Sequence, residues 1–261
     1  MAKALTFRLL GQGIAYSASP AMMNAAFDSL GLPHRYVLAD IPAEKVPGTV
    51  AALREVGAGG ANVTVPHKAA VAAEMDELSD VARAAEAVNT VVREENRLIG
   101  HNTDLPATVE AIRHLRPDGV RHALVLGAGG VGRAVRLALD EVGTERVSVL
   151  RRSDGSIRLL NDVIGDADLL IHATPVGTGS DETLVPAELL RPELAVLDLV
   201  YRPSPTRLVR EARAVGAPAD SGAAILLGQA WRSLELWLGR PAPIEAMRAA
   251  LDAELGGTSD V

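Results

Sequence analysis

Short apolar runs alternate with amphipathic stretches along most of this chain, and each pattern predicts one kind of element. In the first part, the pattern predicts strands at 7–11, 35–41 and 61–65, helices at 19–32, 43–56 and 68–87, and a hairpin over 89–102 that turns at Glu95 and Asn96. Ser19 is expected to cap the first of these helices, with Pro20 at its first position. A further helix is expected from Thr103 and Asp104 to about residue 115.

The second part begins at His122 and repeats the alternation of strand and helix. Its strand-like runs are HALVL, VSVL, ADLLIH and LAVLDLVY. Strands that alternate with helices of about 10–15 residues predict a parallel sheet with crossover helices, so the fold class is α/β. Residues 116–119 (RPDG) are a plausible connection between the two parts. The chain closes with a long helix from about Ile225, with Trp231 and Trp237 on its apolar face, and a short helix at 243–255.

Composition narrows the class of protein. The chain has 261 residues, a net charge of −7 and 48% hydrophobic residues, which is typical of a globular protein of two domains. The absence of cysteine excludes disulfides, thiolate metal sites and cysteine nucleophiles. The chain contains no block of basic residues that would favour nucleic-acid binding. It also contains no run of about 18 apolar residues that would predict a membrane span. The first residues are too polar for a signal peptide, so we expect a cytoplasmic protein without a metal site.

A glycine-rich loop follows the first strand of the second part. Gly127, Gly129 and Gly132 match G-x-G-x-x-G between an apolar strand and a helix, and the loop also contains Ala128, Gly130 and Val131. Such glycines permit a tight turn, a close approach of backbone to a pyrophosphate, and close packing of helix and strand. The helix N-terminus then offers free N–H groups to the anion. The context favours a dinucleotide site over a plain turn.

The end of the next predicted strand indicates which dinucleotide binds. An NAD site usually has an acidic residue there, whereas this chain has Arg151, Arg152 and Ser153. Two guanidinium groups and a hydroxyl suit a 2′-phosphate, which favours NADP. Asp154 is an argument against a phosphate, but it lies beyond the arginines. The alternative is a solvated basic pair in an arginine-rich chain.

Polar residues in the first part occur in an order that resembles the shikimate dehydrogenase family. The shared stretches are SASP (17–20), ANVTVPHK (61–68), AVNT (87–90), GHNTD (100–104), GAGGVG (127–132), RRS (151–153), ATPVG (173–177), DLVYRP (198–203) and G-x-x-I-L-x-x-Q (222–229). The resemblance covers nearly the whole chain. It implies a substrate-binding catalytic domain over 1–104, completed by 229–256, and an NADP-binding Rossmann domain over 105–228.

The resemblance also implies roles for individual residues. Ser17 and Ser19 would bind the substrate carboxylate, with Tyr201 nearby. The ring hydroxyls would be bound by Asn62, Thr64, Asn89 and Gln229. The nicotinamide would lie along Gly222 and the turn that contains Thr174, Pro175 and Val176. Lys68 and Asp104 match the catalytic pair of the family.

The chemistry of ketone reduction agrees with that pair. A ketone that accepts a hydride also needs a proton donor, which Lys68 can be, while Asp104 orients the ammonium group. Lysine is rare in this chain, since Lys3, Lys45 and Lys68 are its only lysines among 26 basic residues. Arginine serves elsewhere as the cation, and arginine cannot release a proton at physiological pH. The alternative for Lys68 is an exposed residue at the start of a helix.

Several positions depart from the family pattern and leave the substrate open. The departures are Gly13, Tyr16, Met23, Leu105 to Ala107, His172, Thr178 and Ile225. His172 has no second ligand at a useful spacing, so it indicates a core or loop histidine rather than a metal ligand. The expected activity is NADP-dependent reduction of 3-dehydroshikimate by a monomer or homodimer. The alternatives are action on quinate, aminoshikimate or a related ring acid, and a non-catalytic sensor of NADP or a cyclic acid.

Overall fold

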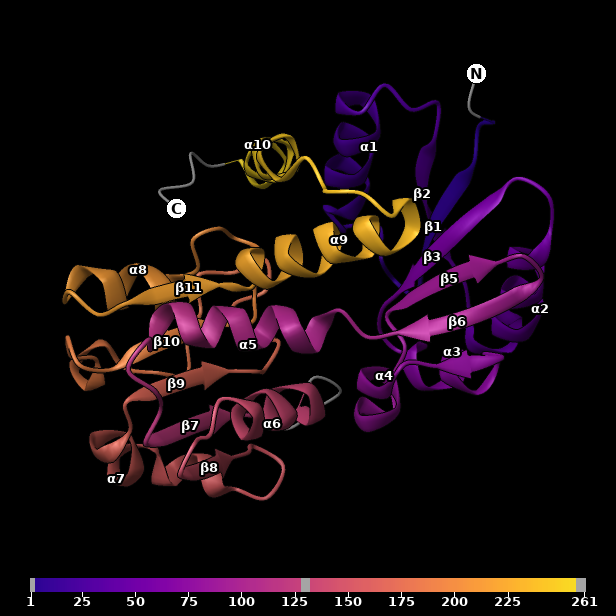
Figure 1. Ribbon diagram of the computed structural model, residues 1–261. Helices are drawn as coiled ribbons and strands as arrows, with labels where there is room; N and C mark the ends of the chain where they lie inside the picture. The colour runs from indigo at the N-terminus through magenta and orange to yellow at the C-terminus, as the bar shows by residue number, and fades with distance from the viewer. Residues whose placement is uncertain (1–2, 128–131, 257–261) are drawn as a thin grey trace. The chain divides into compact units, whose positions relative to one another are not determined.

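The computed structural model describes residues 3–127 and 132–256 (Figure 1). The chain divides into two compact units. Unit 1 comprises the residues up to Asp104 together with those from Leu227 onward, and unit 2 comprises Leu105–Leu226. The C-terminal part of the chain therefore returns to unit 1, and the predicted α/β class is confirmed.

Unit 1 is built on a mixed sheet. Its six strands, in the order β2-β1-β3-β5-β6-β4, are β1 (Thr6–Gly11), β2 (Arg35–Asp40), β3 (Ala58–Val63), β4 (Glu77–Leu78), β5 (Thr90–Glu94) and β6 (Arg97–His101). Strands β1, β2 and β3 are parallel, whereas β5 is antiparallel to both β3 and β6. The predicted hairpin is confirmed, with Glu95 in the left-handed region at its turn (φ 53°).

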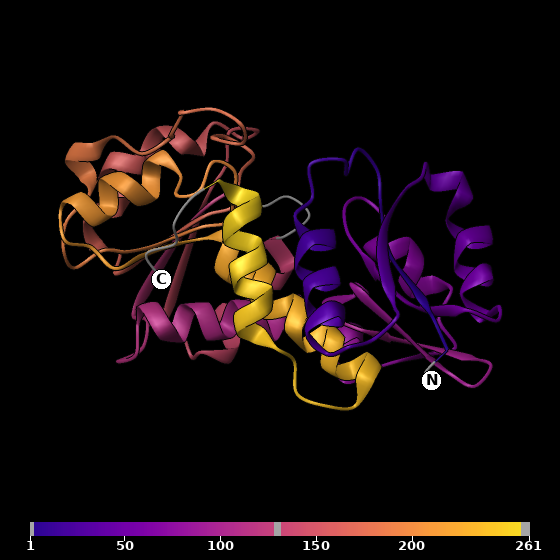
Figure 2. The ribbon, with the colours of Figure 1, turned by 90° about the horizontal axis from the view of Figure 1, so that it is seen from above.

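Helices cover both faces of this sheet. They are α1 (Ser19–Ser29), α2 (Val46–Ala51), α3 (Lys68–Ala73), α4 (Asp80–Ala85), α10 (Ile244–Leu255) and most of α9 (Gly222–Leu238), with 3-10 turns η1 (Ala43–Lys45) and η2 (Ala52–Arg54). Helix α10 packs against α1, and the two lie side by side in Figure 2. One face of the sheet buries an aliphatic core that includes Leu10, Leu53 and Val71. Elsewhere in the unit, the buried Phe7 packs against the buried Phe27 and the half-buried Trp237.

Three local predictions for unit 1 were wrong. The helix predicted over 68–87 is broken into α3, β4 and α4, because Asp76 pairs with Arg54 and accepts a hydrogen bond from Leu98 N, which holds that segment in another conformation. Ser19 is the first residue of α1 rather than its cap, which is Ala18. The helix predicted over 43–56 consists of η1, α2 and η2.

Strand β3 begins at Ala58, three residues before the strand predicted at 61–65, for a reason that sequence pattern does not show. A Cβ atom on Gly59 would lie 2.5 Å from the ring of Phe7, and one on Gly60 would lie 2.7 Å from Trp237 Nε1. The glycines let two aromatic rings pack directly on the strand backbone. Trp237 Nε1 also donates to Val91 O at 3.0 Å.

Unit 2 is built on a parallel sheet. Its five strands, in the order β11-β10-β9-β7-β8, are β7 (His122–Leu126), β8 (Arg146–Leu150), β9 (Leu169–His172), β10 (Ala195–Asp198) and β11 (Ala219–Ser221). The helical segments are α5 (Asp104–Leu115), α6 (Gly132–Glu141), η3 (Ser156–Leu159), α7 (Leu160–Val163), η4 (Ile164–Asp166), η5 (Ala187–Leu189) and α8 (Arg207–Ala214). Alternate residues of the strands enter two separate cores, so runs such as HALVL are apolar throughout.

Candidate active site

The carboxyl ends of β1, β3 and β6 and the amino end of β5 lie at one edge of the unit 1 sheet. Backbone hydrogen bonds join this row, from Thr64 N to Leu10 O, from Val63 N to Asn89 O and from Asn89 N to His101 O. The segments that leave this edge carry most of the polar residues singled out in the sequence. We call this group, which consists of Ser17, Ser19, Thr64, Lys68, Asn89 and Asp104, the unit 1 edge.

Lys68 and Asp104 form an ion pair at the unit 1 edge. Lys68 is the first residue of α3 and Asp104 the first residue of α5, and Lys68 Nζ lies 2.6 Å from Asp104 Oδ2. The two side chains are 23% and 21% exposed, so solvent and a small ligand can still reach them. A short charge-assisted contact of this kind fixes the direction of the ammonium group.

Ser17 and Ser19 place two hydroxyl groups together at the beginning of α1. Ser17 Oγ lies 3.2 Å from Ser19 Oγ and accepts a hydrogen bond from Ser19 N at 3.3 Å. The nearby Asp40 carboxylate is occupied by the backbone N–H groups of Gly13 and Ile14. Paired hydroxyls at the first turn of a helix suit an anionic ligand group.

Asn89 and Asn62 lie in a buried network of hydroxyl and amide groups. Asn89 Oδ1 accepts from Thr103 N at 2.7 Å, and Asn89 Nδ2 donates to Thr103 Oγ1 at 2.9 Å. Asn62, which is 4% exposed, donates through Nδ2 to Thr90 and Ser233 and accepts from the hydroxyl of Tyr36 at 2.8 Å. Burial raises the pKa of Tyr36, so its hydroxyl keeps the proton that it donates.

Sequence reasoning missed four members of this network, namely Tyr36, Thr90, Thr103 and Ser233. Ser233 lies on α9 and is fully buried, and its hydroxyl lies 2.8 Å from Thr90 Oγ1 and donates to Gln229 O at 2.9 Å. It therefore joins the C-terminal part of the chain to β3 and β5 in unit 1. Thr90 follows the predicted residue Asn89 in the motif AVNT, and Thr103 precedes the predicted residue Asp104 in GHNTD. This proximity was the only signal in the sequence that could have identified them.

The carboxyl ends of β7, β8 and β9 form the second candidate region. Chain connections from β7 lead to β8 on one side and later to β9 on the other, and ligands of open α/β sheets bind where the strand order switches in this way. Gly127 follows β7 with φ 97°, and a Cβ atom there would lie 2.8 Å from Ala173 O. Only glycine lets the two strand ends approach so closely.

A hollow of about 320 Å³ opens at this switch point. It is lined by Gly127, Arg151, Arg152, Ser153, Thr174, Pro175 and Val176. We call these residues the unit 2 edge. All of them were predicted from the sequence as cofactor residues, and the structure brings them together. The lining of the hollow includes a glycine and two arginines, a set that fits a nucleotide with an added phosphate.

The arginines of the unit 2 edge differ in their partners. Arg151 lies 3.9 Å from Asp154, and both side chains are 49% exposed. Arg152 forms no ion pair with any residue in the described ranges 3–127 and 132–256. The hydroxyl of Ser156 donates to Asp154 at 2.6 Å and holds the pKa of that carboxyl below its usual range. Asp154 is therefore a fixed negative charge beside the arginines.

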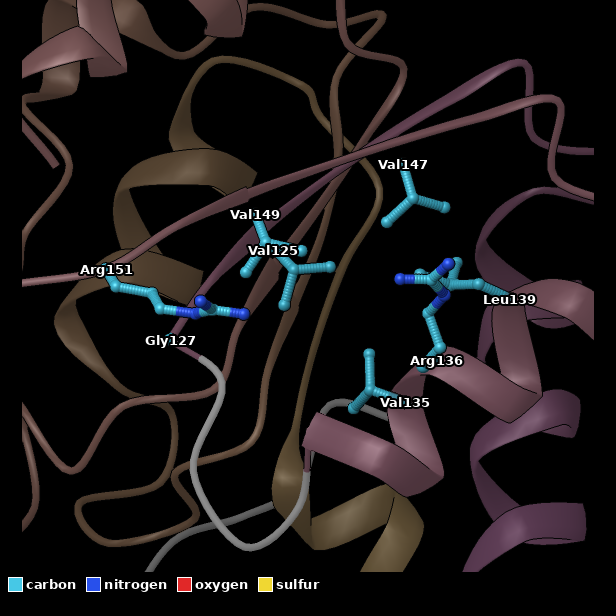
Figure 3. Close-up of a pocket in the computed structure, with 8 residues that line it drawn as sticks. All are labelled: Val125, Gly127, Val135, Arg136, Leu139, Val147, Val149 and Arg151. Atoms are coloured by element: carbon cyan, nitrogen blue, oxygen red, sulfur yellow. The ribbon is translucent and has the colours of Figure 1, made fainter. Parts of the chain in front are cut away.

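A second cavity of about 200 Å³ lies between α6 and the strands β7 and β8. Its lining is mainly valine, and Figure 3 shows the side chains of Arg136 and Arg151 among these valines. Arg136 is on α6 and was not singled out in the sequence. Arg151 lines both cavities, so it stands between them.

Comparison with known proteins identifies the family. The family model described as the shikimate dehydrogenase substrate binding domain matches residues 9–91, and the one described as the shikimate 5′-dehydrogenase C-terminal domain matches residues 222–251. A shikimate dehydrogenase (NADP(+)) from Pyrococcus abyssi is 37% identical over 96% of this chain and 98% of its own length. The chain belongs to the shikimate dehydrogenase family.

Solved structures of family members have the same fold. Shikimate 5-dehydrogenase from Thermus thermophilus, in complex with NADP(H) and shikimate, is 40% identical with a TM-score of 0.85, over 96% of this chain and 100% of that one. Quinate dehydrogenase from Corynebacterium glutamicum, in complex with NAD, is 29% identical with a TM-score of 0.87, over 96% and 99% of the two chains. Proteins of this fold therefore include a shikimate dehydrogenase bound to NADP(H) and a quinate dehydrogenase bound to NAD.

The remaining predicted residues fall in several places. Gln229 is buried on α9 in unit 1, and Tyr201 follows β10 in unit 2. Gly222 begins α9 and packs on the carbonyl of Leu199, where a Cβ atom would collide. The loop residues Ala128, Gly129, Gly130 and Val131 lie outside the described residues, and Gly132 is the first residue of α6.

Two further features of the described residues concern metal binding and the crossing of a membrane. No group of three or more His, Asp or Glu side chains in 3–127 and 132–256 is arranged to hold a metal ion. Within the same ranges, no helix is both long and apolar enough to cross a bilayer. His172, which departs from the family pattern, is a buried histidine at the end of β9 beside Asp198.

Proposed function

We propose that the protein is an NADP-dependent shikimate dehydrogenase that reduces 3-dehydroshikimate to shikimate. The observation that carries this proposal is the ion pair of Lys68 and Asp104, which lies at one sheet edge with paired serine hydroxyls and an amide. Relatives named shikimate dehydrogenase (NADP(+)) support the substrate and the cofactor.

The proposed reaction needs a hydride and a proton. NADPH supplies, when bound, the hydride that reduces the ketone carbon. As that C–H bond forms, the π electrons of the carbonyl move to its oxygen, and Lys68 Nζ donates a proton to this oxygen to give the hydroxyl. Asp104 accepts a hydrogen bond from Nζ and orients the ammonium group. In the oxidative direction, the same Nζ accepts the proton from the hydroxyl.

We assign the other polar residues of unit 1 to substrate binding. Ser17 and Ser19 would donate to the ring carboxylate, and Tyr201 would lie near it. Thr64, Asn89 and Gln229 would bind ring hydroxyls. Asn62 would act in the same set, and it also holds Asn89 through a hydrogen bond from Nδ2 to Asn89 O at 3.1 Å.

We assign the unit 2 edge, together with the loop 127–132 and Gly222, to NADP. Gly127 leaves room for the backbone to approach the pyrophosphate, and the first turn of α6, which begins at Gly132, would present backbone N–H groups to it. Arg151, Arg152 and Ser153 would bind the 2′-phosphate. Thr174, Pro175 and Val176 would line the other side of the cofactor. With the domain limits implied by the resemblance, 1–104 with 229–256 and 105–228, these cofactor residues all lie in the second domain, and the substrate residues other than Tyr201 lie in the first.

Two substitutions at Lys68 test the mechanism. Lys68→Ala removes the proton donor, and Lys68→Arg keeps the positive charge but cannot release a proton. Both are expected to lower kcat by about a thousandfold, within the usual range for general acid–base catalysis. Lys45→Ala, which changes an exposed lysine in η1, is the matched control and should keep wild-type kcat. Full activity of Lys68→Arg would show that charge alone is needed.

A related ring acid is the second candidate substrate. Quinate dehydrogenase from Corynebacterium glutamicum has the same fold, and this chain has Tyr16 and Met23 where the family usually has histidine. Initial rates with shikimate, quinate and aminoshikimate, each with NAD and NADP, separate the candidates. No turnover with any pair would favour a non-catalytic sensor.

We further propose a cytoplasmic protein that acts as a monomer or homodimer and needs neither nucleic acid nor a membrane. Light scattering during gel filtration, with and without NADP, would give the oligomeric state. A larger assembly would contradict this proposal.

A further inference from the structure

Two buried polar side chains beneath the turn 174–176 have no part in the proposed reaction. His172 is the last residue of β9 and Asp198 the last residue of β10, and the parallel register places them opposite each other. His172 Nδ1 lies 2.8 Å from Asp198 Oδ1, and the two side chains are 2% and 3% exposed. A buried pair of this kind is costly unless each group is fully hydrogen-bonded.

Asp198 is held by donors on several sides. Its Oδ2 accepts from the hydroxyl of Thr206 at 2.7 Å, and its Oδ1 accepts from Val200 N at 3.1 Å. The carboxylate is therefore fixed in place and accepts from the Nδ1–H of His172. In the neutral imidazole, a proton on Nδ1 leaves the lone pair on Nε2.

That lone pair faces Thr174. His172 Nε2 lies 2.5 Å from Thr174 Oγ1, so in the tautomer with its proton on Nδ1 the threonine hydroxyl donates to the ring. Thr174 Oγ1 also accepts from Val176 N at 3.3 Å. A hydroxyl has one proton and two lone pairs, so one lone pair remains for a ligand. Thr174 lines the same hollow as Arg151 and Arg152.

We propose that His172, held by Asp198, is a positioning residue that makes the Thr174 hydroxyl a hydrogen-bond acceptor in the cofactor cavity. A ligand group that matches it must be a donor, such as a hydroxyl of a ribose or an amino group of a base. This proposal rests on the proposed function, because NADP is taken as the ligand of the cavity. It gives the histidine, a departure from the family pattern, a role in cofactor binding.

The substitution His172→Asn isolates this role. The amide nitrogen of asparagine can replace Nδ1 and keep the hydrogen bond to Asp198, but the shorter side chain cannot reach Thr174. The expected result is an increase of about fivefold in the Kd for NADP, which corresponds to one positioned hydrogen bond. The KM for shikimate should stay at the wild-type value. Kd is measured by calorimetric titration with NADP.

A second buried histidine of the same sheet gives the control. His122 begins β7, at the opposite end of the strands, and its Nε2 lies 2.9 Å from Ser148 Oγ. His122→Asn removes a histidine–hydroxyl contact of the same kind away from the cavity. It should leave the Kd for NADP unchanged. A general effect of loosening the sheet would raise the Kd in both variants and would overturn the proposal.

A double-mutant cycle tests whether His172 acts through Thr174. Thr174→Val removes the hydroxyl, and in that background His172→Asn should have no further effect on the Kd for NADP. Thr174→Ser, which keeps the hydroxyl, should bind as the wild type does. An undiminished effect of His172→Asn in the Thr174→Val background would overturn the proposal. If His172→Asn does not fold, the comparison of Thr174→Val with Thr174→Ser decides, and equal Kd values overturn it.

Wild-type measurements keep the two proposals apart. A wild type that neither binds NADP nor oxidises shikimate would overturn the proposed function and this inference with it. A wild type that does both, beside a His172→Asn variant with unchanged Kd, would overturn the inference alone.

Discussion

The unit 1 edge and the unit 2 edge both lie where strands of a sheet end, but they hold their polar groups differently. In unit 1, Lys68 is paired with Asp104, and Asn89 with Thr103, at distances below 3 Å. In unit 2, Arg152 has no ion pair within residues 3–127 and 132–256, and Arg151 is only 3.9 Å from a half-exposed carboxylate. The first region holds its polar groups in fixed positions, as a proton transfer requires. The second has positive charge that is available to bind an anionic ligand.

The largest expected effect is at the fixed pair. Asp104→Asn keeps the shape but removes the charge that holds the Lys68 ammonium group. We expect kcat to fall by about a hundredfold, with the KM for NADP unchanged. Initial rates of shikimate oxidation measure both. Asp118→Asn, which changes an exposed residue of the loop between α5 and β7 in unit 2, is the control, and equal kcat values in the two variants would contradict the assignment.

The next effect concerns charge in unit 2. Arg152→Ala should raise the KM for NADP by about tenfold, since a guanidinium–phosphate contact is lost, and should leave the KM for NAD nearly unchanged. The control is Arg158→Ala, which removes an exposed arginine of η3 that does not line the cofactor cavity. The difference between variants should shrink at high salt, because salt screens exposed charges. An equal rise for NAD would refute the phosphate assignment.

A smaller effect is expected on stability in unit 1. Ser233→Ala removes a buried hydroxyl that lies within hydrogen-bond distance of Asn62, Thr90 and Thr103. The free energy of unfolding should fall by about 1–2 kcal/mol, because partners in the buried network are left unsatisfied. Urea denaturation measures it against Ser29→Ala, an exposed serine at the end of α1. Unchanged stability would mean that water replaces the hydroxyl.

The smallest effect should act in the opposite direction. Asp154 is negatively charged near neutral pH, as an ordinary aspartate is, and the hydrogen bonds from Ser156 hold its pKa below the usual range. Asp154→Asn removes this charge and can still accept from Ser156 N. The KM for NADP should fall by about twofold, an effect on the order of an exposed ion pair. A rise in KM would show that the turn, and not the charge, matters.

Site residues could be predicted where the type of residue itself indicates its chemical role. A lysine in a chain that has only three, or two arginines after a parallel strand, can be found by reading along the sequence. Ser233 could not be found in this way, since one serine in an apolar helix has no pattern. Its role depends on Thr90, which is 143 residues earlier in the chain.

The same limit applies to the fold. Most strands and the hairpin follow from local alternation, so they were predicted close to their observed positions, whereas the short strands β4 and β11 were not predicted. The break in the helix predicted over 68–87 depends on Arg54 and Leu98, which are distant in sequence from Asp76. The strand conformation of Gly59 and Gly60 depends on Phe7 and Trp237, again distant residues. Local pattern predicts elements, but contacts between distant segments decide where they end.

The return of α9 and α10 to unit 1 has a consequence for biosynthesis. Unit 2 is one continuous segment, Leu105–Leu226, so all of its strands are translated before most of α9. Unit 1 receives Ser233 and Trp237 only afterwards, although its first strand is made at the start. The part of the protein translated first is therefore completed last, and until then β3 and β5 expose the polar groups that Ser233 covers.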